Sequence, residues 1–71
     1  MPSISQEDVD KAAAELSVDA KGRQEAEARF KEWGVEATDD HVRMYLALKT
    51  LKGKQGGRCS ARDFKAYKPH N

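Results

Sequence analysis

Cysteine and histidine are scarce in this 71-residue chain, and their scarcity argues against a disulfide-linked fold and against a zinc site. The single cysteine, Cys59, cannot form an internal disulfide, which suits a reducing cytoplasm. The two histidines, His41 and His70, and Cys59 offer three scattered ligands, whereas a zinc site needs about four at close spacing. We therefore expect no metal and no other cofactor.

Long apolar stretches and catalytic motifs are also lacking. The most apolar segment, 42–51, is too short and too charged to cross a membrane, and nothing resembles a signal peptide. No serine lies in a nucleophile-elbow pattern. Asp39 and Asp40, at the start of a predicted helix, are typical of capping rather than of an acid–base pair. These absences predict a cytoplasmic protein that is not an enzyme and binds no membrane.

The apolar residues that are present indicate a small helical core. They recur at i, i+3, i+4 and i+7, and no segment shows the alternation of a strand. A chain this short buries only about 60% of its unfolded surface, so a partner or a second copy in a homodimer would add stability. We expect these residues to be buried together: Leu16, Phe30, Trp33, Val42 and Leu46.

The pattern predicts one all-α domain over residues 1–71, a small bundle of three main helices and a short C-terminal fourth. Ser5 with Asp8, and Ser60 with Asp63, have the spacing of capping boxes. Gly34 suits the left-handed conformation that ends a helix. The expected helices span about 6–17, 23–33, 39–52 and 61–67.

Thr38 and three other residues mark the remaining expected boundaries. Thr38 is the cap expected for the third helix. Gly22 and Gly53 are expected outside helices, so the first helix frays towards Gly22 and the third ends before Gly53. Pro69 ends the fourth helix.

Charge is divided sharply along the chain. Residues 1–40 hold 5 Lys/Arg and 11 Asp/Glu, a balance of −6, whereas residues 41–71 hold 8 Lys/Arg and the single acid Asp63, a balance of +7. Such asymmetry indicates that the basic half binds nucleic acid or another acidic partner. The other interpretation is that the two halves neutralise each other across the folded surface or a dimer interface.

The basic half provides the leading functional hypothesis. The glycine-rich segment 52–58 lacks the Gly-Lys-Ser/Thr ending of a Walker A motif. Its glycines nevertheless let a backbone approach phosphates, and Lys/Arg side chains neutralise phosphate charge. The candidate nucleic-acid-binding residues are Arg43, Lys49, Lys52, Lys54, Arg58, Arg62 and Lys65.

Several segments within residues 4–51 carry a resemblance to a known family. These are Ile4-Ser5-Gln6-Glu7-Asp8-Val9, Ala12-Ala13-Ala14-Glu15-Leu16, Lys21-Gly22-Arg23, Trp33-Gly34, and Val42 with Leu46. Together they resemble the N-terminal DNA-binding domain of KfrA-type plasmid proteins. The resemblance implies a helix-turn-helix-like unit whose third helix enters the major groove of DNA. The chain departs from the family pattern at Gln24-Glu25, where Pro-Thr is usual.

Two functions stay open on this evidence. The first is a nucleic-acid-binding domain, with DNA as the leading ligand, that binds mainly the charged phosphate backbone. The second is a protein-interaction module, such as an accessory or inhibitory protein of a mobile element, that binds no nucleic acid. A contiguous basic face on the third helix and glycine-rich segment favours the first function. Basic residues paired with the acids of the first two helices favour the second.

The capping pattern leads to a stability test. Ser5→Ala and Ser60→Ala should each lower the free energy of unfolding by about 1 kcal/mol, because each removes the acceptor for an orphan backbone N–H group. Gly34→Ala should cost a comparable amount, because alanine disfavours the left-handed region. Urea unfolding followed by circular dichroism measures all three. Wild-type stability in Gly34→Ala would contradict a helix end at this residue.

Overall fold

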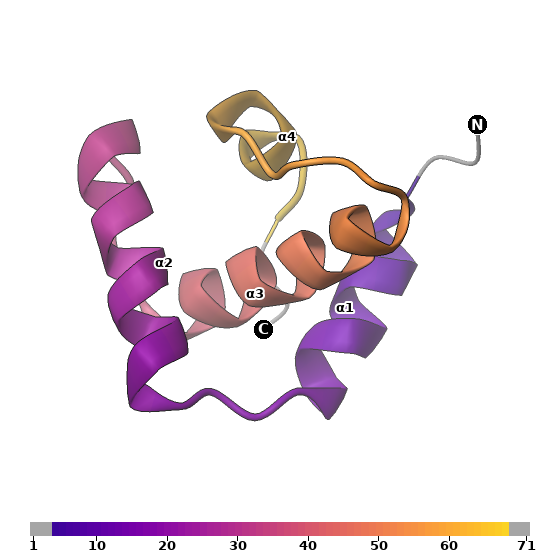
Figure 1. Cartoon of the computed structure of the whole chain (residues 1–71), viewed down its shortest axis with the longest axis horizontal. Coiled ribbons are helices and arrows are strands. Elements are labelled where there is room, and N and C mark those ends of the chain that lie inside the picture. The colour runs from indigo at the N-terminus through magenta and orange to yellow at the C-terminus, as the bar shows by residue number, and fades with distance from the viewer. Residues whose placement is uncertain (1–3, 69–71) are drawn as a thin grey trace.

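The computed structural model describes residues 4–68, in which four helices and no strand occur (Figure 1). The predicted all-helical fold class is therefore confirmed. In chain order the helices are α1 (Gln6–Glu15), α2 (Ala20–Trp33), α3 (Asp39–Lys54) and α4 (Ala61–Lys65).

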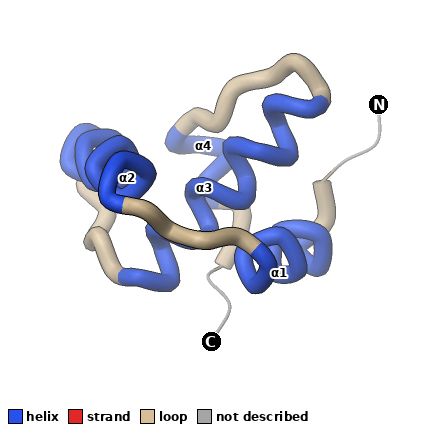
Figure 2. Tube along the Cα trace, turned by 60° about the horizontal axis from the view of Figure 1, so that its bottom comes forward, coloured by secondary structure: helices blue, strands red, loops and turns tan. Residues whose placement is uncertain are grey.

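Helix α3 lies at the centre and packs against α1, α2 and α4 (Figures 1 and 2). Its apolar residues occupy most of its circumference, which is typical of a helix that is covered on several sides. Five of them are buried: Val42, Met44, Tyr45, Ala47 and Leu48. Helices α2 and α3 are joined by residues 34–38, an arrangement compatible with the predicted helix-turn-helix-like packing.

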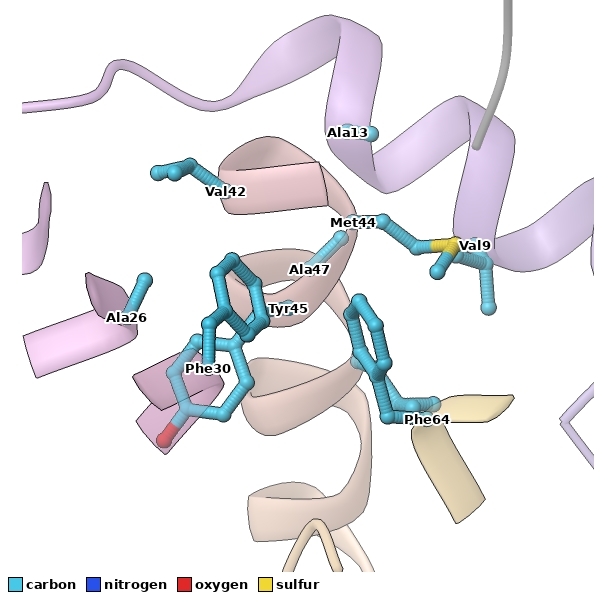
Figure 3. Close-up of a cluster of buried hydrophobic side chains, with 10 residues drawn as sticks. Val9, Ala13, Ala26, Phe30, Val42, Met44, Tyr45, Ala47 and Phe64 are labelled. Atoms are coloured by element: carbon cyan, nitrogen blue, oxygen red, sulfur yellow. The ribbon is translucent and has the colours of Figure 1, made fainter. Parts of the chain in front are cut away.

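Phe30 is the centre of an aromatic cluster in the core (Figure 3). Its ring is fully buried and lies 5.7 Å from the Tyr45 ring and 5.0 Å from the Phe64 ring, measured between centroids. Phe30 and Val42 are buried as predicted. The expectation was too strong for Leu16, Trp33 and Leu46, which are only partly buried and pack against the edge of the core.

The predicted caps are confirmed. Both capping boxes are formed, and the Asp8 and Asp63 N–H groups donate to Ser5 Oγ at 3.1 Å and Ser60 Oγ at 3.3 Å. Thr38 caps α3 through the His41 N–H group.

The end of α2 is also as predicted. Gly34 is left-handed, with φ of 70°. The Val35 N–H group donates back to the Phe30 carbonyl at 2.9 Å, which closes the last turn in the manner of a Schellman motif.

Two glycines expected outside helices lie inside them. Helix α2 begins at Ala20 rather than at residue 23, because Asp19 caps it and accepts from the Gly22 N–H group at 2.6 Å. Helix α3 continues through Gly53 to Lys54. The left-handed glycine of the following turn is Gly56, with φ of 76°.

The other helix ends differ from the prediction by two residues. Helix α1 ends at Glu15 because Leu16, at its C-cap, is extended, with ψ of 155°. Helix α4 ends at Lys65 rather than at residue 67. The end predicted at Pro69 lies outside the described residues.

The C-terminal side of α4 is joined to the start of α1. The Tyr67 hydroxyl donates to the Ile4 carbonyl at 2.6 Å. The Gln6 amide exchanges two hydrogen bonds with the backbone of Lys68, at 2.7 and 2.9 Å. These contacts span more than 60 residues of sequence and hold the chain that follows α4 against the start of α1.

The two helical glycines should respond oppositely to alanine. Gly53→Ala should raise the free energy of unfolding by about 0.5–1 kcal/mol, because nothing lies within 4 Å of the added Cβ and alanine favours helix. Gly22→Ala should not raise it, because its Cβ would lie 3.0 Å from Asp19 Oδ1 and 3.2 Å from Leu46 Cδ1. Urea unfolding of both variants provides the comparison. Equal stabilisation by both would show that α2 and α3 do not approach closely at Gly22.

Candidate nucleic-acid interface

The seven predicted binding residues divide into two groups. Four of them make contacts within the described part of the chain: Arg43, Lys49, Lys52 and Lys65. The other three, Lys54, Arg58 and Arg62, are exposed and have no hydrogen bond or ion pair from their side chains to any residue in 4–68. The structure therefore separates cations used within the fold from cations that face solvent.

Arg43 contacts the end of α1. Its Nη1 lies 3.2 Å from both the Ala13 and the Leu16 carbonyl oxygens and donates to them. A cation is favourable there because the last carbonyls of a helix carry partial negative charge. Near the start of the same α3 helix, Arg23 pairs with Asp39 at 2.6 Å. The N-terminal part of α3 thus makes contacts within the molecule.

Two lysines of α3 pair with acids on neighbouring helices. Lys49 pairs with Glu25 of α2, and Lys52 pairs with Asp63 of α4 at 3.1 Å. The hydrogen bond from Lys52, followed by that from Ser60, holds the pKa of Asp63 below its usual value. The side chains of Lys49 and Glu25 are 50% and 44% exposed, so this pair contributes little to stability and can exchange with another anion.

Lys65, on α4, reaches the end of α2. Its Nζ lies 3.4 Å from the Trp33 carbonyl oxygen. This contact is a long hydrogen bond to an exposed backbone group, so the ammonium remains available to a phosphate close to Trp33. Lys65 is therefore a fourth cation available to a phosphate, in addition to Lys54, Arg58 and Arg62.

A groove of about 560 Å³ lies between α2, the C-terminal half of α3 and residues 57–61. Aromatic side chains line it together with residues of both charges. The lining includes Trp33, Tyr45, Arg29, Lys49, Arg58, Glu25, Glu32 and Cys59. Of the predicted binding residues, the groove brings Lys49 and Arg58 together.

Sequence reasoning missed Trp33 and Arg29 as candidate site residues. Trp33 is the last residue of α2 and Arg29 lies four residues earlier, so both are on one face of the helix. The position of a large aromatic residue at a helix end, four residues after an arginine, was the available signal. It was outweighed by the assumption that the single tryptophan belongs wholly to the core.

Trp33 is held in place by neighbouring rings. Its ring centroid lies 5.7 Å from that of Tyr45, 5.6 Å from that of Phe64 and 6.1 Å from that of Phe30. Burial raises the pKa of Tyr45, and a hydrogen bond from Arg29 partly offsets this rise. Trp33 therefore presents a supported, partly exposed aromatic surface in a groove that also contains cations.

The single cysteine has a raised pKa, and the described residues show neither a cluster of metal-ligating side chains nor a helix of membrane-spanning length. Burial, followed by the nearby Asp63 carboxylate, raises the pKa of the Cys59 thiol to about 11, the opposite of the shift that activates a nucleophilic cysteine. Residues 4–68 contain no group of three or more His, Cys, Asp or Glu side chains placed to hold a metal ion. None of the helices formed by these residues is long and apolar enough to cross a membrane.

Comparisons with protein-family models, with curated proteins and with solved structures find no match to this chain. The resemblance to KfrA-type proteins accordingly stays a prediction.

The raised pKa of Cys59 predicts slow alkylation. At pH 8 the folded thiol should react with iodoacetamide about a hundredfold more slowly than the same thiol in urea, because its pKa of about 11 leaves fewer thiolates than the ordinary value of 9.0. Mass spectrometry of timed samples measures the rate. The folded rate should rise steeply between pH 9 and 11, and equal rates in both states at pH 8 would contradict the burial of this thiol.

Proposed function

We propose that this protein is a nucleic-acid-binding module rather than an enzyme, and that it contacts the phosphate backbone through Lys54, Arg58 and Arg62. One observation carries the proposal. Residues 53–62 hold these three exposed cations and no acid, and the adjacent Asp63 is already paired with Lys52. Uncompensated positive charge therefore collects on one short segment.

The chemistry of this segment suits phosphates. Binding releases counterions from the nucleic acid, and exposed lysine and arginine lose little by exchanging water for phosphate oxygens. Three glycines, Gly53, Gly56 and Gly57, keep the backbone free of bulky side chains, and no atom lies within 4 Å of a Cβ at Gly53 or Gly56. Because the cations are on the last residue of α3, the following loop and the short α4, we expect affinity without strong sequence preference.

This mode of binding differs from the one that the KfrA resemblance implies. In the implied mode, the N-terminal part of the third helix meets the major groove. Here Asp39 and Asp40 carry negative charge at that position, and Arg43 contacts the carbonyls of α1. We therefore place the nucleic acid at the opposite end of α3, beside Lys54. The proposed setting is the cytoplasm, and DNA is the leading ligand.

A second candidate function is binding to another protein, and a specific observation favours it. Lys49 of α3 pairs with Glu25 of α2, and Arg23 of α2 pairs with Asp39 of α3. The Lys49–Glu25 pair neutralises part of the basic half within the molecule, whereas Arg23 and Asp39 both lie within residues 1–40. In this alternative, the exposed acids of α1, including Glu7 and Glu15, would meet a basic partner.

Salt-dependent binding tests the main proposal. The wild-type protein should bind a fluorescein-labelled 20-base-pair duplex at low salt. A Lys54→Gln, Arg58→Gln, Arg62→Gln triple variant should bind more weakly, with a log–log salt slope shallower by up to about 0.9 for each lost contact. Fluorescence anisotropy over a series of salt concentrations gives both quantities.

The matched control is the Lys11→Gln, Lys21→Gln, Lys31→Gln variant. It removes the same amount of charge from exposed lysines on α1 and α2. It should keep most of the affinity if the position of the charge matters. The proposal fails if the wild type binds no nucleic acid at low salt, or if both triple variants behave alike.

A further inference from the structure

We infer that the groove beside Trp33 binds an unpaired base of single-stranded nucleic acid, with the base stacked on the Trp33 ring. This inference rests on the proposed function, because phosphate contacts through Arg58 and its neighbours bring the strand to the groove. It adds the form of nucleic acid that the protein prefers.

The aromatic surface is already in position. Trp33 is partly exposed in the groove, while the rings of Tyr45, Phe64 and Phe30 support it from the core. A ring held in this way loses little conformational freedom when a base stacks on it. Single-stranded nucleic acids are commonly bound by such stacking, because every unpaired base offers a π face.

Cations lie where the phosphates of a stacked nucleotide need them. Arg58 lines the same groove as Trp33, and Lys65 Nζ lies 3.4 Å from the Trp33 carbonyl oxygen. Lys54 and Arg62 extend this charge along the flanking segment. When a base stacks on Trp33, cations from two parts of the protein chain therefore lie near the phosphates of the bound strand. An uncharged ligand would not contact these cations.

The groove also offers hydrogen-bond partners to a base. Glu25 and Glu32 line it, and Glu32 lies 3.9 Å from Arg29, beyond hydrogen-bond distance. Carboxylates repel phosphate but accept hydrogen bonds from the amino groups of bases. The cations Arg29, Lys49 and Arg58 line the groove as well, and Lys49 is paired with Glu25, so the groove offers a base both donors and acceptors. A volume of about 560 Å³ is within the usual range for a small-ligand site.

A duplex cannot use this groove in the same way. Its bases are stacked on each other and present only their edges, so no π face is available to Trp33. We therefore expect the duplex to bind only through contacts between its phosphates and the protein's cations. A single strand should add stacking to the same charge contacts.

Trp33 is the only tryptophan in the chain, so its fluorescence reports directly on the site. The wild-type protein is titrated with a single-stranded 12-mer, with the corresponding duplex, and with an abasic 12-mer that keeps the phosphates and lacks the bases. Binding is followed separately by anisotropy. We expect the single strand to quench Trp33, and both the duplex and the abasic strand to bind without quenching.

A variant gives a second readout. Trp33→Leu should weaken binding of the single strand by about 5- to 100-fold and change duplex binding by less than about twofold. Leu51→Ala serves as the control, because Leu51 also packs against the core but does not line the groove. Circular dichroism establishes that each variant is folded. The quenching experiment uses the wild type and stays decisive if Trp33→Leu does not fold.

The outcomes separate the two proposals. If no oligonucleotide binds, the proposed function fails and this inference fails with it. If the single strand, duplex and abasic strand bind equally and leave Trp33 unquenched, the proposed function stands and base stacking is overturned. Quenching by the abasic strand would also overturn it, because phosphates alone would then explain the signal.

Discussion

The buried ring of Phe30 connects the parts of this protein on which both the fold and the candidate site depend. It extends from α2 and contacts Tyr45 of α3 and Phe64 of α4. Helix α4 has five residues, far fewer than an isolated helix needs for stability in water, so its position depends on Phe64 entering this cluster. The segment before α4 carries Arg58 and lines the groove. The placement of the basic segment therefore follows from the packing of an apolar ring.

The charges of the basic half have two different uses in the structure. Arg43, Lys49 and Lys52 connect α3 to α1, α2 and α4, respectively. The Lys49–Glu25 and Lys52–Asp63 ion pairs compensate charge along the central helix, and the more exposed of them, Lys49–Glu25, adds little to stability. Lys54, Arg58 and Arg62 follow in the chain and have no such partner within the described residues. The same composition thus provides both contacts within the molecule and a surface for an anion.

Much of the fold was predictable because its signals are local. Ser5 and Ser60 cap helices through N–H groups three residues away, and Gly34 ends a helix through its own backbone conformation. Gly22 and Gly53 were placed wrongly because glycine also occurs inside helices, and the local signal of the Asp19 cap was overlooked. Whether a glycine ends a helix or lies inside one depends on its surroundings. Gly22 forms the third residue of a turn capped by Asp19 and permits the close approach of Leu46, 24 residues later.

The sequence by itself determined the helical class, the caps and the amount of positive charge in the second half, because periodicity, capping and composition are properties of neighbouring residues. Tertiary structure decided which cations remain free and which aromatic ring reaches solvent. The partners of Arg43 lie 27 and 30 residues away, and that of Lys49 lies 24 residues away. Such pairings arise from the way helices pack against one another, and the exposure of Trp33 depends on how α4 covers the end of α2. Neither arrangement is encoded in a local pattern.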